Sequence, residues 1–288
     1  MSVTVSRRAA LLAGLGFAMA ACSSGLPDGV PRVGTGKTVY GSFRSRYRHT
    51  EVGWAVSYPP GPSVLHSGPH SGPPSGPPSG RLPVLVFLHM RGGNHDDAFG
   101  ASLHLDHYLA DAVDHGMRPF AIAAVDGGDH EYWHPRRDTD PAGMVVHEFL
   151  PLLARQGLDV GRIGLMGASM GGYGTLYLAE RLGRARVAVA VAESPAIWHE
   201  AAQTVEGAFD DAADFAAHTI FGRRRLARLE GIALRIDCGA QDGFAPITRD
   251  LRARIHPTPA GGIAPGEHDS SYWRGQAPAQ LRFVGRHL

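Results

Sequence analysis

The sequence predicts an α/β protein in which helices cover both faces of a mostly parallel sheet. Two observations support this prediction. Short apolar runs with the length of buried strands alternate along the chain with longer helical stretches. One such run, residues 162–166, leads through a tight glycine turn into an alanine- and leucine-rich helix that ends near Arg181. The composition agrees, because 288 residues with 43% hydrophobic and 19% charged side chains suit one globular domain with a large core.

The first 21 residues are predicted to be an export signal that is not part of the fold. Arg7 and Arg8 precede an apolar segment that is too short for a comfortable membrane span, and the pair resembles a twin-arginine signal. Residues 19–22 resemble a bacterial lipobox, with Met19 where leucine is usual. Cys22 would then become a lipidated amino terminus that holds the protein at the membrane surface. The alternative is an ordinary signal cut near Ala20 and a secreted product.

The rest of the chain is predicted to be a flexible tether, residues 22–36, followed by one enzyme-sized domain, residues 37–288. Within this domain, residues 59–80 form a low-complexity proline, glycine and serine insert, which cannot bury a core and is predicted to be disordered. Cys22 and Cys238 are the only cysteines. If Cys22 is lipidated or removed, no intramolecular disulfide can form, and Cys238 at a strand end is expected to be buried.

Six segments are predicted to be strands. The first two alternate apolar with small or polar residues and should be an antiparallel pair at the sheet edge. The others are nearly continuous apolar runs, as expected for strands covered on both faces. In order, the predicted strands are residues 39–44, 52–58, 82–89, 120–125, 187–192 and 232–238, in addition to residues 162–166.

Three further segments are predicted to be helical. Residues 103–115 follow the strand at 82–89, and residues 142–155 form an amphipathic helix. From His199 to Arg228 the composition turns helical and charged. We interpret this last segment as a small helical excursion near the functional site, where specificity would reside.

Ser169 is the candidate nucleophile. It stands at the centre of Gly-x-Ser-x-Gly, residues 167–171, between a predicted strand and a predicted helix. A serine on such a strained turn is pushed out of the sheet, and its neighbours must lack bulk for the backbone to pass. The five-residue pattern alone is weak in a chain with 38 glycines. Its place between strand and helix therefore decides the interpretation.

A nucleophilic serine needs a base, and the base needs an orienting acid. Asp242 follows the predicted strand that ends at Cys238, and His268 lies in a loop ahead of the last helix. The chain order is therefore serine, acid, histidine, which is the order found in enzymes whose nucleophile stands on a strand-to-helix turn of this kind. Asp237 and Asp250 are rival acids, but the first lies within a strand and the second is placed for a helix. Asp269 is next to His268, and adjacency in a loop does not provide the required hydrogen bond.

The loop after the strand at 82–89 is the candidate oxyanion loop. The loop is rich in glycine. In enzymes whose nucleophile stands on such a strand-to-helix turn, a loop in this place supplies one backbone N–H of the oxyanion hole, and the residue after the nucleophile supplies the other. The candidates are Arg91 and Met170, both through their main chains. The alternative for Gly92 and Gly93 is a plain turn.

Aromatic residues after two predicted strands are candidates for a substrate pocket. Tyr132 and Trp133 lie in a loop that leaves the carboxyl end of the sheet, and Trp198 follows the strand at 187–192. They could line an acyl or sugar pocket. Aromatic packing beneath a long loop is the alternative for Tyr132 and Trp133.

Four segments together resemble the esterase D and mycolyltransferase group of α/β-hydrolases: residues 165–174 around the serine, 238–242 around the acid, 266–273 around the histidine, and the loop 88–97. The resemblance covers about residues 38–288. It implies an α/β-hydrolase fold and acyl-ester chemistry, with a small-molecule, lipid or glycolipid ester as substrate. Two departures, Asp242 where mycolyltransferases carry glutamate and Met90 in place of a loop glycine, favour a general esterase.

Several other function classes find little support. A net charge of +1 gives no argument for nucleic acid as a partner. The chain has no phosphate-binding Gly-x-x-x-x-Gly-Lys motif and a single lysine, Lys37, so no nucleotide cofactor is predicted. Among 16 histidines, His104 and His107 flank Asp106, but no His-Glu-x-x-His or paired-cysteine pattern exists, and no metal is predicted.

The leading hypothesis is an exported serine esterase. An acyltransferase that passes an acyl group to a carbohydrate hydroxyl would use the same residues, and a catalytically silent binding protein would use the same scaffold. The acyl length, the alcohol and the oligomeric state stay open.

Overall fold

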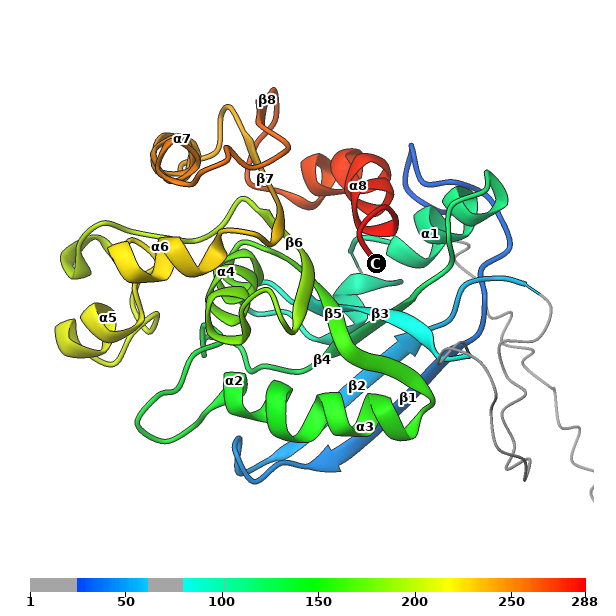
Figure 1. The fold of residues 1–288 in the computed structure, drawn as a ribbon, viewed down its shortest axis with the longest axis horizontal. Helices are drawn as coiled ribbons and strands as arrows, with labels where there is room; N and C mark the ends of the chain where they lie inside the picture. The colour runs from blue at the N-terminus through cyan, green and yellow to red at the C-terminus, as the bar shows by residue number, and fades with distance from the viewer. Residues whose placement is uncertain (1–24, 62–79, 101) are drawn as a thin grey trace, which may run out of the picture.

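The structure is a computed structural model and describes residues 25–61, 80–100 and 102–288. The predicted export segment, Cys22 and most of the predicted insert lie outside the described residues. The described part of the chain is built on one sheet with the strand order β1-β2-β4-β3-β5-β6-β7-β8 (Figure 1). The strands are β1 Thr38–Arg44, β2 Glu51–Ser57, β3 Leu82–Leu88, β4 Ala121–Val125, β5 Leu158–Ala168, β6 Val187–Glu193, β7 Ala233–Gly239 and β8 Ile263–Ala264.

The sheet is mostly parallel, as predicted. The antiparallel pairs are β1 with β2 and β2 with β4, at one edge. The remaining neighbours, from β4 through β3 and β5 to β8, all run parallel. Because the carboxyl ends of parallel strands meet at one edge, the loops after β3, β5, β6 and β7 come together there.

Helices cover both faces of the sheet (Figure 1). In β3, Val84, Val86 and Leu88 belong to one hydrophobic core, and Leu85 and Phe87 belong to the other, as the alternation of side chains in a strand requires. The first core includes α2, α3 and α4, and the second includes α1 and α8. The helices are α1 Leu105–Asp114, α2 Pro141–Met144, α3 Leu150–Arg155, α4 Met170–Leu182, α5 Ala212–His218, α6 Arg223–Leu229, α7 Ala245–Arg254 and α8 Ser270–Gly285.

The amphipathic helix predicted at 142–155 is present but not uniform. Helix α2 runs directly into a π-helical turn, Val145–Phe149, and then into α3. The predicted excursion at 199–228 consists of a short 3₁₀ helix, Ala201–Gln203, followed by α5 and α6. The strand β8 was not predicted. It has only two residues, which pair with Cys238 and Gly239.

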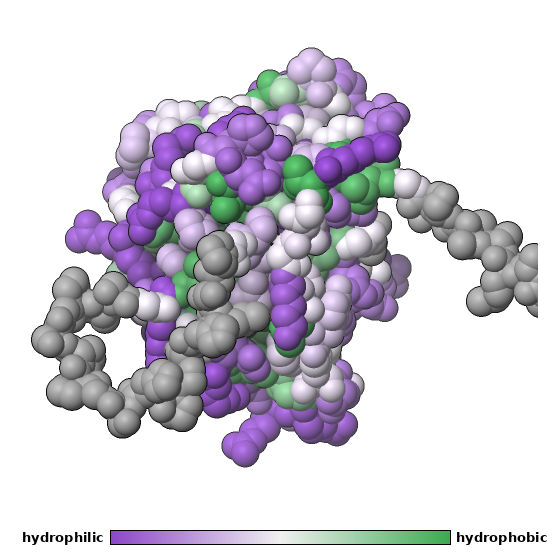
Figure 2. Space-filling view, turned by 90° about the vertical axis from the view of Figure 1, so that its right-hand side faces the viewer, coloured by the Kyte–Doolittle hydropathy of each residue, from purple (hydrophilic) through white to green (hydrophobic). Residues whose placement is uncertain are grey.

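The surface seen in Figure 2 mixes hydrophilic and hydrophobic residues, and the hydrophobic ones form small separate groups. Among the described residues, Tyr40 and Val205 are the large hydrophobic side chains that count as exposed. No helix in the described part of the chain is long and apolar enough to cross a membrane.

Candidate active site

Ser169 lies at the sharp turn between β5 and α4. Its backbone has φ 54° and ψ −117°, a conformation that is strained for a residue with a side chain. The turn is held from both sides, because the Ser169 N–H donates to the Glu193 carbonyl at 2.9 Å and the Ser169 carbonyl accepts from Ala196 N–H at 3.0 Å. Strand β6 and its loop therefore fix the serine at the carboxyl end of the sheet.

The two glycines of the Gly-x-Ser-x-Gly pattern allow close backbone packing. A Cβ on Gly171 would lie 1.9 Å from the Leu88 carbonyl oxygen, and a Cβ on Gly167 would lie 2.4 Å from the Gly171 carbonyl oxygen. Both contacts involve backbone atoms, which cannot rotate away. The prediction that the neighbours of Ser169 must lack bulk is thus explained by the fit of α4 against the end of β3.

The structure brings Ser169, His268 and Asp242 together. His268 Nε2 lies 2.9 Å from Ser169 Oγ, and His268 Nδ1 lies 2.8 Å from Asp242 Oδ2. The Asp242 side chain is fully buried, whereas the His268 side chain is 32% exposed. A buried carboxylate therefore holds an imidazole whose other nitrogen reaches a serine hydroxyl at the solvent boundary. This arrangement can remove a proton from the serine.

The carboxylate of Asp242 is kept ionised by its neighbours. Burial raises the pKa of Asp242, but hydrogen bonds from His268, from the Phe244 N–H and from the Ser194 hydroxyl outweigh burial and lower the pKa overall. The Phe244 N–H donates to Asp242 Oδ1 at 2.8 Å. Trp273 Nε1 in turn donates to Ser194 Oγ at 3.2 Å. Asp242 is therefore positioned as an acceptor for the His268 Nδ1–H.

The rival acids are engaged elsewhere. Asp237 accepts from Arg235 Nε at 2.6 Å and from Gln280 Nε2 at 3.1 Å. Asp250 pairs with Arg254 at 2.7 Å and lies 3.2 Å from His199. Asp269 caps α8 by accepting from the Tyr272 N–H at 2.8 Å. The residue next to His268 thus fixes the start of the helix that follows it.

Arg91 and Met170 carry backbone N–H groups without a hydrogen-bond acceptor among the described residues. The same holds for Met90, while the N–H of Gly92 donates to the Asp129 carbonyl at 2.9 Å. Met170 is the first residue of α4, so its N–H has no partner within the helix. The loop after β3 and the start of α4 therefore both offer free donors of the kind an oxyanion needs.

His89 was not singled out in the sequence, yet it holds the loop after β3 in place. Its Nδ1 lies 2.7 Å from the Met90 carbonyl, and its Nε2 accepts from the Gly127 N–H at 2.8 Å. The ring is therefore the neutral Nδ1–H tautomer. Burial is the largest cause of the lowered pKa of His89, which favours this neutral form.

Trp133 is a packing residue and does not line a pocket. Its side chain is fully buried, and its Nε1 donates to the His89 carbonyl at 3.2 Å. A Cβ on Gly127 or Gly174 would collide with its ring. Of the two alternatives for Trp133, the structure supports aromatic packing, because the ring fills the space between α4 and the two loops that follow β3 and β4.

Tyr132 and Trp198 lie together, with ring centroids 5.8 Å apart. Both are nearly buried, with 2% and 8% of their surface exposed. Burial raises the pKa of Tyr132 to about 12, so its hydroxyl stays protonated. Trp198 also contacts Phe244 at 5.6 Å, and Phe244 contacts His268 at 5.4 Å. An aromatic layer thus extends from the base to Tyr132, and Phe244 is a member that the sequence analysis missed.

Three solved structures illustrate what this chain resembles. A ferulic acid esterase aligns with a TM-score of 0.73 and 18% identity over 88% of this chain and 98% of that chain. Fluorophosphonate-binding serine hydrolase F of Staphylococcus aureus aligns with a TM-score of 0.66 and 19% identity over 88% of this chain and 99% of that chain. The S-formylglutathione hydrolase of the same organism aligns with a TM-score of 0.67 and 17% identity over 86% and 98%.

Searches of protein-family models and of curated proteins found no match to the sequence. The similarity is therefore carried by the fold, which aligns over most of this chain and nearly all of each of the three solved structures. The resemblance inferred from the motifs is confirmed for the fold, because the chain has the α/β-hydrolase fold.

Proposed function

We propose that this protein is a serine esterase that hydrolyses carboxylic esters through Ser169, His268 and Asp242. The observation that carries the proposal is the unbroken hydrogen-bonded chain from Asp242 through His268 to Ser169, which ends at a strained elbow. The names of the aligned structures, a ferulic acid esterase and serine hydrolases, support the same class of reaction.

In the proposed mechanism, Ser169 Oγ attacks the ester carbonyl while His268 Nε2 takes its proton. Asp242 fixes the tautomer of His268 and stabilises the imidazolium that forms. The free N–H groups of Met170 and of Arg91 or Met90 would stabilise the negative charge that develops on the carbonyl oxygen. The alcohol leaves with the proton from His268, and water then releases the acyl group by the reverse steps.

The substrate is proposed to be a small-molecule ester whose acyl group lies against aromatic side chains. Phe244 and Trp273 both contact the His268 ring, with centroids 5.4 Å and 5.2 Å away. Planar or apolar acyl groups pack well on such faces. An aromatic acyl ester such as methyl ferulate therefore belongs in the substrate panel beside p-nitrophenyl esters of increasing chain length.

The first experiment compares the purified chain with Ser169→Ala on this panel. We expect kcat/KM to fall by at least about 10⁴-fold in the variant, since a serine nucleophile has no substitute in the site. Ser271→Ala, an exposed serine in the first turn of α8, is the matched control and should retain activity. Full activity in Ser169→Ala would contradict the proposal.

A fluorophosphonate probe separates the remaining outcomes. Labelling of Ser169 without ester hydrolysis, together with acyl transfer to trehalose or another polyol, would favour an acyltransferase. Folded protein that is neither labelled nor active would favour a binding protein on the same scaffold.

We also propose that the protein is exported and anchored to the membrane through a lipid on Cys22. The support is the sequence of residues 1–22, with Arg7 and Arg8 ahead of the apolar segment. Cys238, the only cysteine among the described residues, is buried and free, so the fold needs no disulfide. Cys22→Ser should move the protein from the membrane fraction to the soluble fraction, and an unchanged distribution would argue against the anchor.

A further inference from the structure

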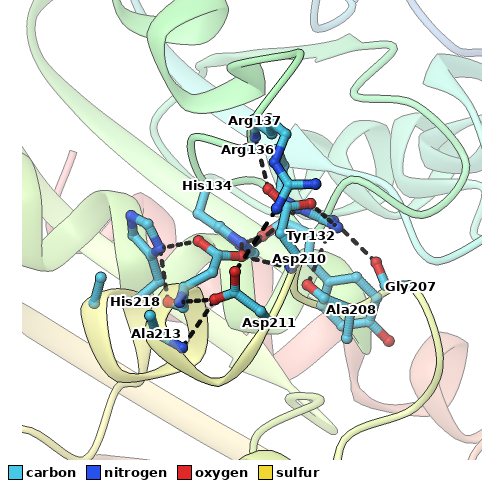
Figure 3. A network of polar contacts seen from close by, with 12 residues as sticks. Tyr132, His134, Arg136, Arg137, Gly207, Ala208, Asp210, Asp211, Ala213 and His218 are labelled. Atoms are coloured by element: carbon cyan, nitrogen blue, oxygen red, sulfur yellow. Dashed lines mark hydrogen bonds and ion pairs between the residues drawn. The ribbon is translucent and has the colours of Figure 1, made fainter.

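Two histidines and one aspartate meet outside the candidate active site, and we call them the His134 cluster: His134, Asp214 and His218. His134 Nε2 lies 3.2 Å from Asp214 Oδ2, and His218 Nδ1 lies 2.7 Å from Asp214 Oδ1. Nitrogen and oxygen atoms from the three residues all lie within 4.8 Å of one another. Figure 3 shows His134 coming from the loop after β4 and His218 from α5, with the side chains turned toward each other.

One ring nitrogen of His134 bonds to neighbouring oxygens, and the other is directed at a carboxylate. Its Nδ1 lies 3.0 Å from the Tyr132 carbonyl and 3.2 Å from the Tyr173 hydroxyl, which itself donates to the His218 carbonyl at 3.0 Å. Both neighbours of Nδ1 are therefore acceptors, so Nδ1 carries the proton. Nε2 is the remaining nitrogen of the ring, and it faces the Asp214 carboxylate at 3.2 Å. A proton or a metal ion between these two atoms would satisfy both of them.

Two arginines and two further aspartates surround the His134 cluster. Arg136 pairs with Asp210 at 2.8 Å, and its Nε lies 3.8 Å from Asp214 Oδ2. Arg137 pairs with Asp211 at 3.7 Å. The Asp210 N–H also donates to Asp214 Oδ2 at 2.8 Å. Three carboxylates, those of Asp210, Asp211 and Asp214, thus lie beside two guanidinium groups.

We propose that the His134 cluster binds a divalent transition metal ion of the zinc class, with His134 Nε2, the Asp214 carboxylate and a ring nitrogen of His218 as ligands. Two imidazoles and one carboxylate are a ligand set that such ions prefer. The Nδ1–H bond from His134 to a backbone carbonyl is the support that metal-ligating histidines use to fix their orientation. Asp214 and His218 are 12% and 17% exposed, so water can reach a fourth position.

The ion would have a structural role. It would hold α5 to the loop that carries Tyr132, and Tyr173 links this region to the nucleophile because its N–H donates to the Ser169 carbonyl at 3.0 Å. None of the three ligands is hydrogen-bonded to Ser169, Asp242 or His268 among the described residues. Metal binding is therefore separable from the esterase activity proposed above.

The test uses the purified chain after chelation and dialysis, titrated with Co²⁺ and followed by its visible d–d absorption. We expect saturable binding of a single ion, displacement of the Co²⁺ by Zn²⁺, and a higher thermal unfolding temperature with Zn²⁺ present. Asp214→Asn and His218→Ala should each weaken Co²⁺ binding by at least about tenfold. Substituting a residue that only hydrogen-bonds to a metal ligand already has an effect of this size, and these two residues are proposed as ligands themselves. Both positions are partly exposed, which makes them safer choices than the buried His134.

Matched controls come from the end of α1, where Asp111 and His115 form the same i,i+4 pair at 3.6 Å on the surface, and no third ligand lies near them among the described residues. His115→Ala and Asp111→Asn should leave Co²⁺ binding unchanged. Absence of saturable Co²⁺ binding would overturn the proposal and leave a hydrogen bond, not a metal ion, between His134 and Asp214. Unchanged binding in folded Asp214→Asn and His218→Ala, verified by circular dichroism, would overturn it as well. Neither readout depends on ester hydrolysis.

Discussion

The role of Asp242 follows from its two carboxylate oxygens, which accept from different donors. Oδ2 faces His268 Nδ1 and Oδ1 accepts from the Phe244 N–H, so the carboxylate cannot rotate without losing a hydrogen bond. Rotation would leave a buried acceptor unsatisfied, which costs roughly 1–3 kcal/mol. The acid is therefore held in the orientation that selects one tautomer of His268.

Asp242→Asn tests this orientation directly. The amide keeps the shape of the side chain but favours the wrong tautomer of His268, so kcat should fall by about 10⁴-fold while KM changes little. Steady-state kinetics on the preferred p-nitrophenyl ester measures both constants. Asp250→Asn, at an exposed rival acid paired with Arg254, is the control and should be nearly unaffected. Equal losses in the two variants would remove Asp242 from its proposed role.

At the scale of single residues, the sequence predicted the three side chains that meet but not the ones that position them. Ser169, Asp242 and His268 could be found because each follows a recognisable strand or precedes a helix. His89 and Ser194 have no such signal, since their roles depend on Gly127 and Trp273, which are 38 and 79 residues distant. The sequence analysis predicted no metal and considered only His104 and His107; the meeting of His134 with Asp214, which is 80 residues away, leaves no pattern in the sequence.

Helix α4 begins in close backbone contact with the end of β3. Gly171→Ala should overpack this contact, because its Cβ would lie 1.9 Å from the Leu88 carbonyl oxygen. We expect a loss of at least about 1–3 kcal/mol in the free energy of unfolding, measured by urea denaturation. Activity should fall as well, since the same shift would move the loop after β3.

Gly275→Ala in α8 is the control, because a Cβ there meets no atom within 4 Å. It should be neutral or stabilising by up to about 1 kcal/mol, owing to the higher helix propensity of alanine. Equal changes in the free energy of unfolding for the two variants would show that the close backbone approach is not the reason why position 171 requires glycine.

The elements that the sequence predicted are those with strong periodic patterns. All six listed strands and the run at 162–166 are present, although β5 begins earlier, at Leu158. The pattern could not reveal β8, since two residues are too few for periodicity and its pairing with β7 is a tertiary contact. The π-helical turn at Val145–Phe149 was equally hidden, because its apolar residues fit an ordinary amphipathic helix.

For the whole molecule, a buried acid at the carboxyl end of β6 makes stability depend on pH. Burial is the largest cause of the strongly raised pKa of Glu193, and the neighbouring Asp237 adds to it. Glu193 is 1% exposed, and one of its oxygens has no hydrogen-bond partner among the described residues. The folded chain therefore holds this proton at pH values where the unfolded chain has released it. The contribution of Glu193 to the free energy of unfolding therefore falls as the pH rises above the ordinary pKa of a glutamate.

Glu193→Gln keeps the neutral, protonated shape and removes the titration. Its thermal unfolding temperature relative to the unmodified chain should therefore increase steadily from pH 5 to pH 8. Glu206→Gln, at an exposed position, should show no such trend. A constant difference between the Glu193 variant and the unmodified chain across this range would mean that Glu193 is ionised in the folded state.

The separation of the triad along the chain also sets the order in which it is completed during synthesis. Ser169 leaves the ribosome 99 residues before His268, and the sheet lacks β7 and Asp242 until most of that interval has passed. A nascent chain thus carries the serine without its base or its acid. Its hydroxyl stays as unreactive as that of any surface serine until α8 packs against α1 and brings His268 to the elbow.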